Sequence, residues 1–253
     1  MKYWPLLVTL VMAWAFIGMS DELSSVVNGL SNIIDYIKGS WPPDLSVIPS
    51  LREPMTETFQ MGLLGVGLGS VIAIPLSILA ASDTTPNLLF YAWSRVAINI
   101  CRSIPTLLWA ILFVAVLGLG PMSGIIALAA HCIGSLGKYF SEGIEATYPK
   151  VKDTLEAMEV DGANRLQTVV HGVAPAVAPL FASYIIYYLE WAIREGAILG
   201  LVGAGGLGLR LTMSIRMFKR HETAAIVLVL LIIVTVIDFF SRLVRKQILE
   251  ANV

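Results

Sequence analysis

Six apolar runs constrain this chain more than any other feature of its sequence. They cover about residues 3–19, 57–81, 97–120, 122–140, 174–192 and 222–241. Each run is close to the roughly 20 residues that a helix needs to cross a bilayer. Charged residues make up only 14% of the chain, too few to cover a water-facing surface. We therefore expect an all-α integral membrane protein with about six transmembrane helices.

The N-terminal part is expected to differ from the rest of the chain. Residues 1–55 are predicted to form a first transmembrane helix and an external amphipathic segment, and residues 56–253 the main transmembrane domain. The alternative, a cleaved signal peptide, is disfavoured because Ser20-Asp21-Glu22 is a poor cleavage site. Apolar residues recur at helical spacing from Leu23 to Ile37, which predicts a helix lying along the membrane surface.

Basic residues set the expected orientation. The loop after the fourth run and the C-terminus both carry Lys and Arg, which favours placing both on the cytoplasmic side, with the N-terminus there as well. The segment 194–221 would then be external, although it is also basic. Either it attracts an anionic substrate or an acidic partner, or the run boundaries there are wrong. Its cations are Arg194, Arg210, Arg216, Lys219 and Arg220.

A polar loop follows the fourth run. It is predicted to contain two short helices, residues 139–147 and 151–159, and then a tight turn at Asp161-Gly162-Ala163. Gly162 suits such a turn because it adopts positive φ without a Cβ clash, and Pro175 suits the first turn of the next helix. A short helix–turn–helix that projects from a membrane bundle is suited to docking on another protein.

The same loop resembles the EAA signature of ABC-importer permeases. Glu156, Ala157, Gly162 and Pro175 match the signature at the right spacing, whereas Met158, Gly172 and Ala174 depart from it. The resemblance implies a coupling loop at about residues 141–173 that inserts into a separate ATPase. The residues expected to carry the coupling are Glu156, Ala157, Gly162, Ala163 and Pro175.

A wider likeness, over about residues 40–245, narrows the family. The stretches 41–44, 117–121 and 161–164 resemble phosphonate-type permeases, and phosphite and hypophosphite importers look much the same. Residues 101–105 and the glycine-rich stretch 195–208 resemble methionine-type permeases. The substrate implied is a small phosphorus oxyanion, and methionine or another small nutrient is the alternative.

This resemblance also implies the assembly. The chain would be one of two permease subunits, identical or homologous, in a bacterial inner membrane, with two ATP-binding subunits and an extracytoplasmic binding protein. ATP and magnesium would bind to the ATPase, so no cofactor, metal or catalytic residue is expected in this chain. Membrane lipid is an expected partner and nucleic acid is not, because no basic patch dominates a net charge of −1.

Polar and flexible residues at membrane depth are the candidates for the pathway or its gate, because charges are costly there. Glu190 and Arg194 lie four positions apart, so they can instead simply pair with each other. His131 is expected to be a hydrogen-bonded packing residue. The full set of candidates is Arg102, Ser103, Pro105, Glu190, Arg194, Gly203, Gly205 and Gly206.

Two sequence motifs raise the question of enzymatic activity. The glycines of 200–208 lack the Gly-Lys-Ser/Thr ending of a nucleotide-binding loop, which argues against ATP binding by this chain. Residues 161–165 resemble the start of a membrane phosphotransferase motif. That metal-dependent chemistry needs further aspartates a few turns later, and none occurs before Glu190. A membrane phosphotransferase is therefore the alternative of a different class.

Overall fold

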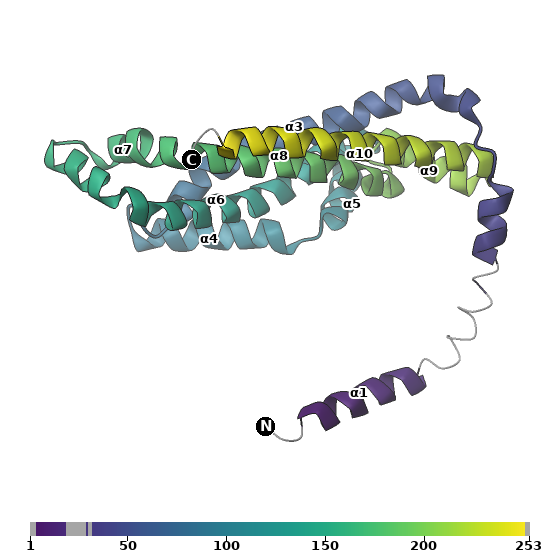
Figure 1. The fold of residues 1–253 in the computed structure, drawn as a ribbon, viewed down its shortest axis with the longest axis horizontal. Helices are drawn as coiled ribbons and strands as arrows, with labels where there is room; N and C mark the ends of the chain where they lie inside the picture. Colours follow the sequence, from purple (N-terminus) through teal and green to yellow (C-terminus); the bar gives the residue numbers. More distant parts are fainter. Residues whose placement is uncertain (1–3, 19–28, 30–31, 251–253) are drawn as a thin grey trace.

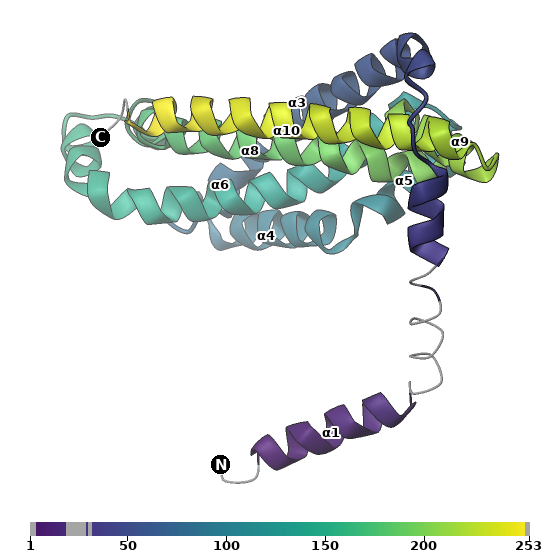
Figure 2. The same cartoon turned by 45° about the vertical axis from the view of Figure 1, so that its right-hand side comes forward.

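The computed structural model describes residues 4–18, 29 and 32–250, and within these residues it is helical without strands. Helix α1 (Trp4–Gly18) lies apart from the other helices, which form one elongated bundle (Figures 1 and 2). The predicted surface helix is described only in part, because residues 19–28 and 30–31 lie outside the described residues. Residues 32–39 are helical and expose Ile33, Ile34 and Ile37.

Helix α3 (Arg52–Ala80) follows the short helix η1 (Leu45–Leu51) and packs through its small residues. A Cβ added at Gly65 would meet Leu128, and one added at Gly69 would meet Cys132. Both partners belong to helix α6, so this pair of glycines serves packing inside the chain. Close approach of two backbones is the usual role of small residues at this spacing.

The third predicted run is broken in the structure. In place of one helix over residues 97–120, α4 (Leu88–Ser103) and α5 (Thr106–Leu117) meet at 87°. Between them, Ile104 is extended (φ −88°, ψ 121°), because the ring of Pro105 disfavours helical backbone in the residue before it. The single helix predicted over residues 97–120 is therefore wrong, because the chain changes direction at Pro105.

Helix α6 (Pro121–Val160) replaces three predicted pieces with one helix of 40 residues. The two short helices expected at 139–147 and 151–159 are both parts of it. The helix continues through Pro149, and pairs of opposite charge at i, i+4 support its polar half, including Lys152 with Glu156 at 3.6 Å. At about 60 Å it is roughly twice as long as the hydrocarbon core of a bilayer is thick.

The remaining helices are α7 (Arg165–Thr168), the π-helical turn η2 (Val169–Val173), α8 (Ala174–Leu199), the turn η3 (Gly200–Val202), α9 (Gly206–Arg216) and α10 (Arg220–Glu250). Of these, α8 runs back along α6, and α10 packs against α8 and α9. Helices α7 and α9 lie at opposite ends of the bundle (Figure 1), and we call these the α7 end and the α9 end.

Three helical segments of the described chain are long and apolar enough to cross a membrane: residues 45–80, 169–202 and 220–248. The bent pair α4–α5 would add a fourth. The expected number of six spans is therefore still a prediction.

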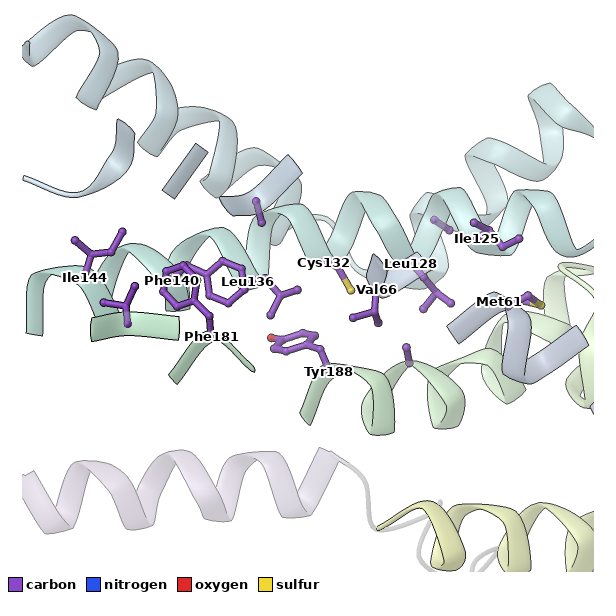
Figure 3. Packing of buried hydrophobic residues seen from close by; sticks show 14 of the residues in the cluster. Met61, Val66, Ile125, Leu128, Cys132, Leu136, Phe140, Ile144, Phe181 and Tyr188 are labelled. Carbon is purple, nitrogen blue, oxygen red and sulfur yellow. The ribbon is translucent and has the colours of Figure 1, made fainter. Parts of the chain in front are cut away.

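The core of the bundle lies along α6, between α3 and α8 (Figure 3). Phe140 of α6 stacks on Phe181 of α8, with ring centroids 4.0 Å apart. Met61 and Val66 contribute from α3, and Ile125, Leu128, Cys132 and Leu136 continue the cluster along α6. Burial of these side chains joins α6 to both neighbours, so the turns at the two ends are carried on a packed frame.

Candidate functional site

The turn between α6 and α7 lies at the extreme α7 end of the molecule (Figure 1). Helix α6 ends in a Schellman motif, in which the N–H of Ala163 donates to the carbonyl of Met158 at 3.0 Å. Gly162 occupies the left-handed position of this motif, with φ 90°. The tight turn predicted at Gly162 is thus present in the structure.

A reciprocal cap starts the next helix. The N–H of Gln167 donates to Oδ1 of Asn164 at 2.9 Å, and the N–H of Asn164 donates to Oε1 of Gln167 at 2.8 Å. This capping box satisfies two backbone donors that would otherwise lack partners. The sequence analysis named Asn164 only as part of a likeness, although the Asn-x-x-Gln spacing carried the signal for a cap.

The two sides of this hairpin are packed against each other. Leu155 is buried, and Gly172 lies so close to it that a Cβ on Gly172 would overlap the Leu155 side chain. Gly172 is one of the departures from the EAA signature, and this contact gives it a structural reason. Pro175 is in the first turn of α8, directly after the π-helical turn. We call residues 150–173 the coupling hairpin.

The coupling hairpin exposes a distinct surface. Glu156, Ala157 and Gly162 are exposed, and Ala163 is partly buried. Val160 is 86% exposed, the highest value for a large apolar side chain among the described residues. The sequence analysis missed Val160, although a valine between Glu159 and Asp161 was visible as an isolated apolar residue. Because it lies exposed at the tip of a packed hairpin, Val160 is accessible to a partner protein.

The α4–α5 break holds the first group of pathway candidates. Arg102 and Ser103 end α4 with exposed side chains, and Pro105 follows them. A Cβ on Gly134 would meet the backbone of Arg102, which places Arg102 beside α6 roughly 20 Å from its start. Arg102 therefore lies beside the apolar half of α6, well away from the α7 end.

His131 lies beside this break as a packing residue, as predicted. Its ring stacks on Trp191 with centroids 4.9 Å apart, and its Nε2 is 3.1 Å from Oγ of Ser135. The stacking on Trp191 ties α6 to α8 next to the end of α4.

Glu190 and Arg194 belong to a charge network that joins α8 to α10. Arg194 contacts Glu190 at 3.1 Å and Asp238 at 3.2 Å, and Arg245 contacts Glu190 at 3.2 Å. The charges of the two arginines and two carboxylates balance, so no uncompensated cation remains in this network. Glu190 and Arg194 therefore pair with each other, which was the alternative to a pathway role. Arg245 also lies over the ring of Tyr187, at 5.6 Å from its centroid.

The glycine-rich stretch forms a compact joint at the α9 end. Gly203, Gly205 and Gly206 have φ of 88°, 87° and 68°. The N–H of Gly206 donates to Oε2 of Glu57 at 2.9 Å, and the N–H of Leu207 donates to Oγ1 of Thr58 at 2.8 Å. Two side chains of α3 therefore cap the first turn of α9. Neither was identified from the sequence, because they lie 149 positions away.

A chain with this bundle, this projecting hairpin and this glycine-rich joint can be compared with known proteins. Residues 73–250 match the family described as the binding-protein-dependent transport system inner membrane component. The chain belongs to this family. It is therefore an inner-membrane component of an ABC importer.

Relatives with curated descriptions agree with this membership. The chain is 37% identical over 240 residues to the phosphite transport system permease protein PtxC of Stutzerimonas stutzeri, covering 95% of this chain and 86% of the relative. It is 33% identical over 244 residues to the phosphate-import permease protein PhnE of Mycolicibacterium smegmatis, covering 96% of this chain and 45% of the relative.

Solved ABC transporters have a similar fold. An inward-facing structure of the MetNI methionine ABC transporter superposes with a TM-score of 0.67 at 22% identity, over 81% of this chain and 99% of the other. This likeness concerns the fold alone.

Proposed function

We propose that this permease forms the membrane pathway for a small phosphorus oxyanion and is driven by a separate ATPase that binds the coupling hairpin. The observation that carries the proposal is the hairpin itself, which is rigid, projects at the α7 end and has an exposed apolar tip. Phosphite, phosphonate and phosphate are named in the descriptions of the relatives, which supports this substrate class.

Coupling is assigned to the exposed side of the hairpin. Glu156 and Ala157 lie in the last turns of α6. Gly162 and Ala163 form the turn that reverses the chain, and Pro175 lies in the first turn of α8. Because Leu155 and Gly172 lock the two arms together, a push on the tip moves α6 and α8 as one body. The ATPase would supply ATP and magnesium, and this chain would do no chemistry of its own.

The pathway is assigned to the side of the bundle that contains the α4–α5 break. Arg102 and Ser103 end a helix at membrane depth there, and Thr106 starts the next one. The broken helix would place two helix ends and the Arg102 cation beside the path of the anion. Glu190 and Arg194 would form part of the wall, with their charges offset within the network. Gly203, Gly205 and Gly206 would form the joint that closes the pathway at the α9 end.

The proposed orientation places the α7 end in the cytoplasm and the α9 end outside, with both termini cytoplasmic. The α7 end must face the ATPase if the coupling hairpin binds it. A second permease, identical or homologous, two ATPases and one extracytoplasmic binding protein would complete the importer. The binding protein would provide most of the specificity.

The test measures ATP hydrolysis by the reconstituted complex with its binding protein, in the presence of phosphite, methylphosphonate, phosphate or methionine. We expect a phosphorus oxyanion to stimulate hydrolysis several-fold over the rate with the unloaded binding protein. Stimulation by methionine alone would overturn the substrate assignment and favour the methionine-type alternative. A rate of ATP hydrolysis that does not change when the binding protein is added would overturn the importer assignment.

A further inference from the structure

The turn between α9 and α10 lies at the far α9 end of the molecule, opposite the coupling hairpin (Figure 2). Helix α9 ends there in a Schellman motif, in which the N–H of Lys219 donates to the carbonyl of Ser214 at 3.0 Å, and the N–H of Phe218 donates to the carbonyl of Ile215 at 3.0 Å. Phe218 holds the left-handed position, with φ 57°.

This motif is the same one that ends α6, but with a different residue at its left-handed position. Gly162 fills that position in the coupling hairpin, and glycine is the residue that adopts this backbone without a Cβ clash. Phe218 is the one non-glycine residue with positive φ among the described residues. A phenylalanine here weakens the turn relative to glycine, so its side chain requires another explanation.

Packing within the chain does not provide that explanation. The Phe218 side chain is 83% exposed, second only to Val160 among the large apolar side chains that the structure describes. Its ring stacks on no other aromatic ring of the described chain. Each end of the molecule thus presents a helix–turn–helix with exposed apolar side chains at its tip: Val160 at one end, and Phe218 beside Met217, which is 64% exposed, at the other.

The surroundings of Phe218 are cationic. Residues 206–223 contain Arg210, Arg216, Lys219 and Arg220 but only one carboxylate, Glu222. Arg210 contacts Glu222 at 2.9 Å and Lys219 contacts it at 3.1 Å, so one carboxylate is shared by two cations. Arg216 is exposed, and Arg220 lies over the ring of Tyr36 at 5.2 Å. Positive charge therefore remains around the exposed phenylalanine.

The turn is also held firmly in place. His221 Nδ1 lies 2.8 Å from the carbonyl oxygen of Pro42, and the N–H of Asp44 donates to the carbonyl of His221 at 3.1 Å. Hydrogen bonds from the hydroxyl and the N–H of Ser46 lower the pKa of Asp44, so this carboxylate stays charged at neutral pH. Even with Asp44 included, the turn keeps more cations than carboxylates.

We propose that Phe218 is the anchor by which the loaded binding protein docks on this permease. Its ring would enter an apolar pocket on the binding protein, and carboxylates around that pocket would face Arg216, Lys219 and Arg220. This inference rests on the proposed function, because it requires the binding protein and an external α9 end. A rigid aromatic side chain surrounded by charge is the usual form of a dominant interface residue. Charge complementarity would mainly increase the rate of association.

The first experiment separates binding from folding with Phe218→Gly. Glycine suits the left-handed backbone, so the variant complex should melt at the same temperature as the parent or higher. The concentration of phosphite-loaded binding protein that half-saturates ATP hydrolysis should rise about tenfold or more, because an interface anchor is lost. Basal hydrolysis should stay unchanged. Phe218→Leu, which keeps an apolar side chain, should remain within about threefold of the parent.

A charge variant tests the cationic surroundings independently. Arg216→Glu leaves the Glu222 ion pairs intact, since Arg216 takes no part in them. It should slow association of the binding protein severalfold at low salt, with the difference vanishing as salt is raised. An unchanged association rate would overturn the proposed role of charge at this turn.

A photo-crosslink gives a direct readout with a matched control. The photoreactive p-benzoylphenylalanine is placed at position 218 or at position 160, the two exposed tips, in the complete complex in lipid nanodiscs. Position 218 should capture the binding protein and position 160 the ATPase. Adducts at position 218 with lipid or with the second permease alone would overturn the inference. A half-saturating concentration unchanged by Phe218→Gly would do the same.

Failure of the proposed function would look different. In that case the loaded binding protein would not stimulate ATP hydrolysis by the unsubstituted complex, and position 160 would not capture the ATPase. If the binding protein stimulates the parent complex normally, and Phe218→Gly does not change the half-saturating concentration, only the docking inference is refuted.

Discussion

At the scale of single residues, the clearest functional constraint is the backbone of Gly162. Its φ is 90°, and no atom lies near the position that a Cβ would take, so conformation and not space selects glycine. A β-branched residue is a true outlier in this region, and the left-handed conformation costs an L-residue about 1–2 kcal/mol. We expect Gly162→Val to change the shape of the turn and to lower substrate uptake at least tenfold, measured in proteoliposomes.

The control for this prediction is Gly162→Asn, because asparagine tolerates left-handed backbone. It should keep most of the uptake and still co-purify with the ATPase. Normal uptake by Gly162→Val would mean that the shape of the coupling hairpin does not matter for transport.

Gly208 is constrained by space, in contrast to Gly162. Its added Cβ would overlap the carbonyl of Ala197, where α9 crosses the end of α8. Overpacking a tight contact typically costs about 1–3 kcal/mol. Gly208→Ala should therefore lower the free energy of unfolding by that amount, measured by denaturation in mixed micelles.

Gly67 provides the matched control, because it lies in α3 with ordinary helical backbone and no atom near its Cβ position. Gly67→Ala should be neutral or stabilising by up to about 1 kcal/mol, since alanine is the better helix former. Equal effects of the two substitutions would contradict the close contact at Gly208.

At the scale of elements, the cap of α9 decides how the α9 end is held. The hydroxyl of Thr58 accepts a hydrogen bond from the N–H of Leu207 at 2.8 Å, in a buried position. Thr58→Val keeps the shape but leaves this donor without a partner, at a cost of about 1–3 kcal/mol. Hydrogen exchange of the Leu207 amide should become about tenfold faster or more, as measured by mass spectrometry of peptides from this region.

Thr56→Val is the control on the same helix. Thr56 is exposed, and its hydroxyl bonds only to the nearby carbonyl of Glu53 at 2.8 Å. Exchange at Leu207 should not change in this variant. If Thr58→Val also left the exchange unaltered, α9 would be held by its packing and not by its cap.

These elements also show what the sequence could and could not reveal. The turn at Gly162 was predictable, because a Schellman motif needs one residue of a particular kind at one position. The length of α6 was not predictable, because Pro149 and many charges are typical of a break between separate helices. In the structure most of these charges lie on the exposed side of one continuous helix. The cap on α9 was hidden for another reason: Glu57 and Thr58 meet it only through the tertiary fold.

The break at Pro105 illustrates a third limit. The sequence correctly indicated that a proline lies within an apolar run, but a proline either bends a helix or ends it. Which of the two occurs depends on what surrounds it. Here the backbone of Arg102 packs on Gly134, so α4 ends against α6 and α5 leaves at 87°.

At the scale of the whole molecule, α6 is the longest of the described helices that join the two ends. Helix α6 starts beside the glycine-rich joint, where Gly124 packs against Ala204, and it ends in the coupling hairpin. Its first half is held by the core, but the stretch after Ile144 has fewer partners and lacks one backbone donor at Pro149. Any force that α6 carries from the hairpin to the α9 end passes through this stretch, so its stiffness should affect the efficiency of coupling.

The double substitution Ala146→Gly and Lys150→Gly tests this role of α6. Each glycine in an exposed helix interior costs up to about 1 kcal/mol, so together they soften the helix where it enters the coupling hairpin, without altering the core or the tip of the hairpin. ATP hydrolysis should persist, while the substrate transported per ATP should fall severalfold. Leu243→Gly with Gln247→Gly places the same spacing of glycines on the exposed face of α10 and should leave that ratio unchanged. An unchanged ratio for the α6 variant would mean that motion reaches the α9 end through α8, the other arm of the hairpin.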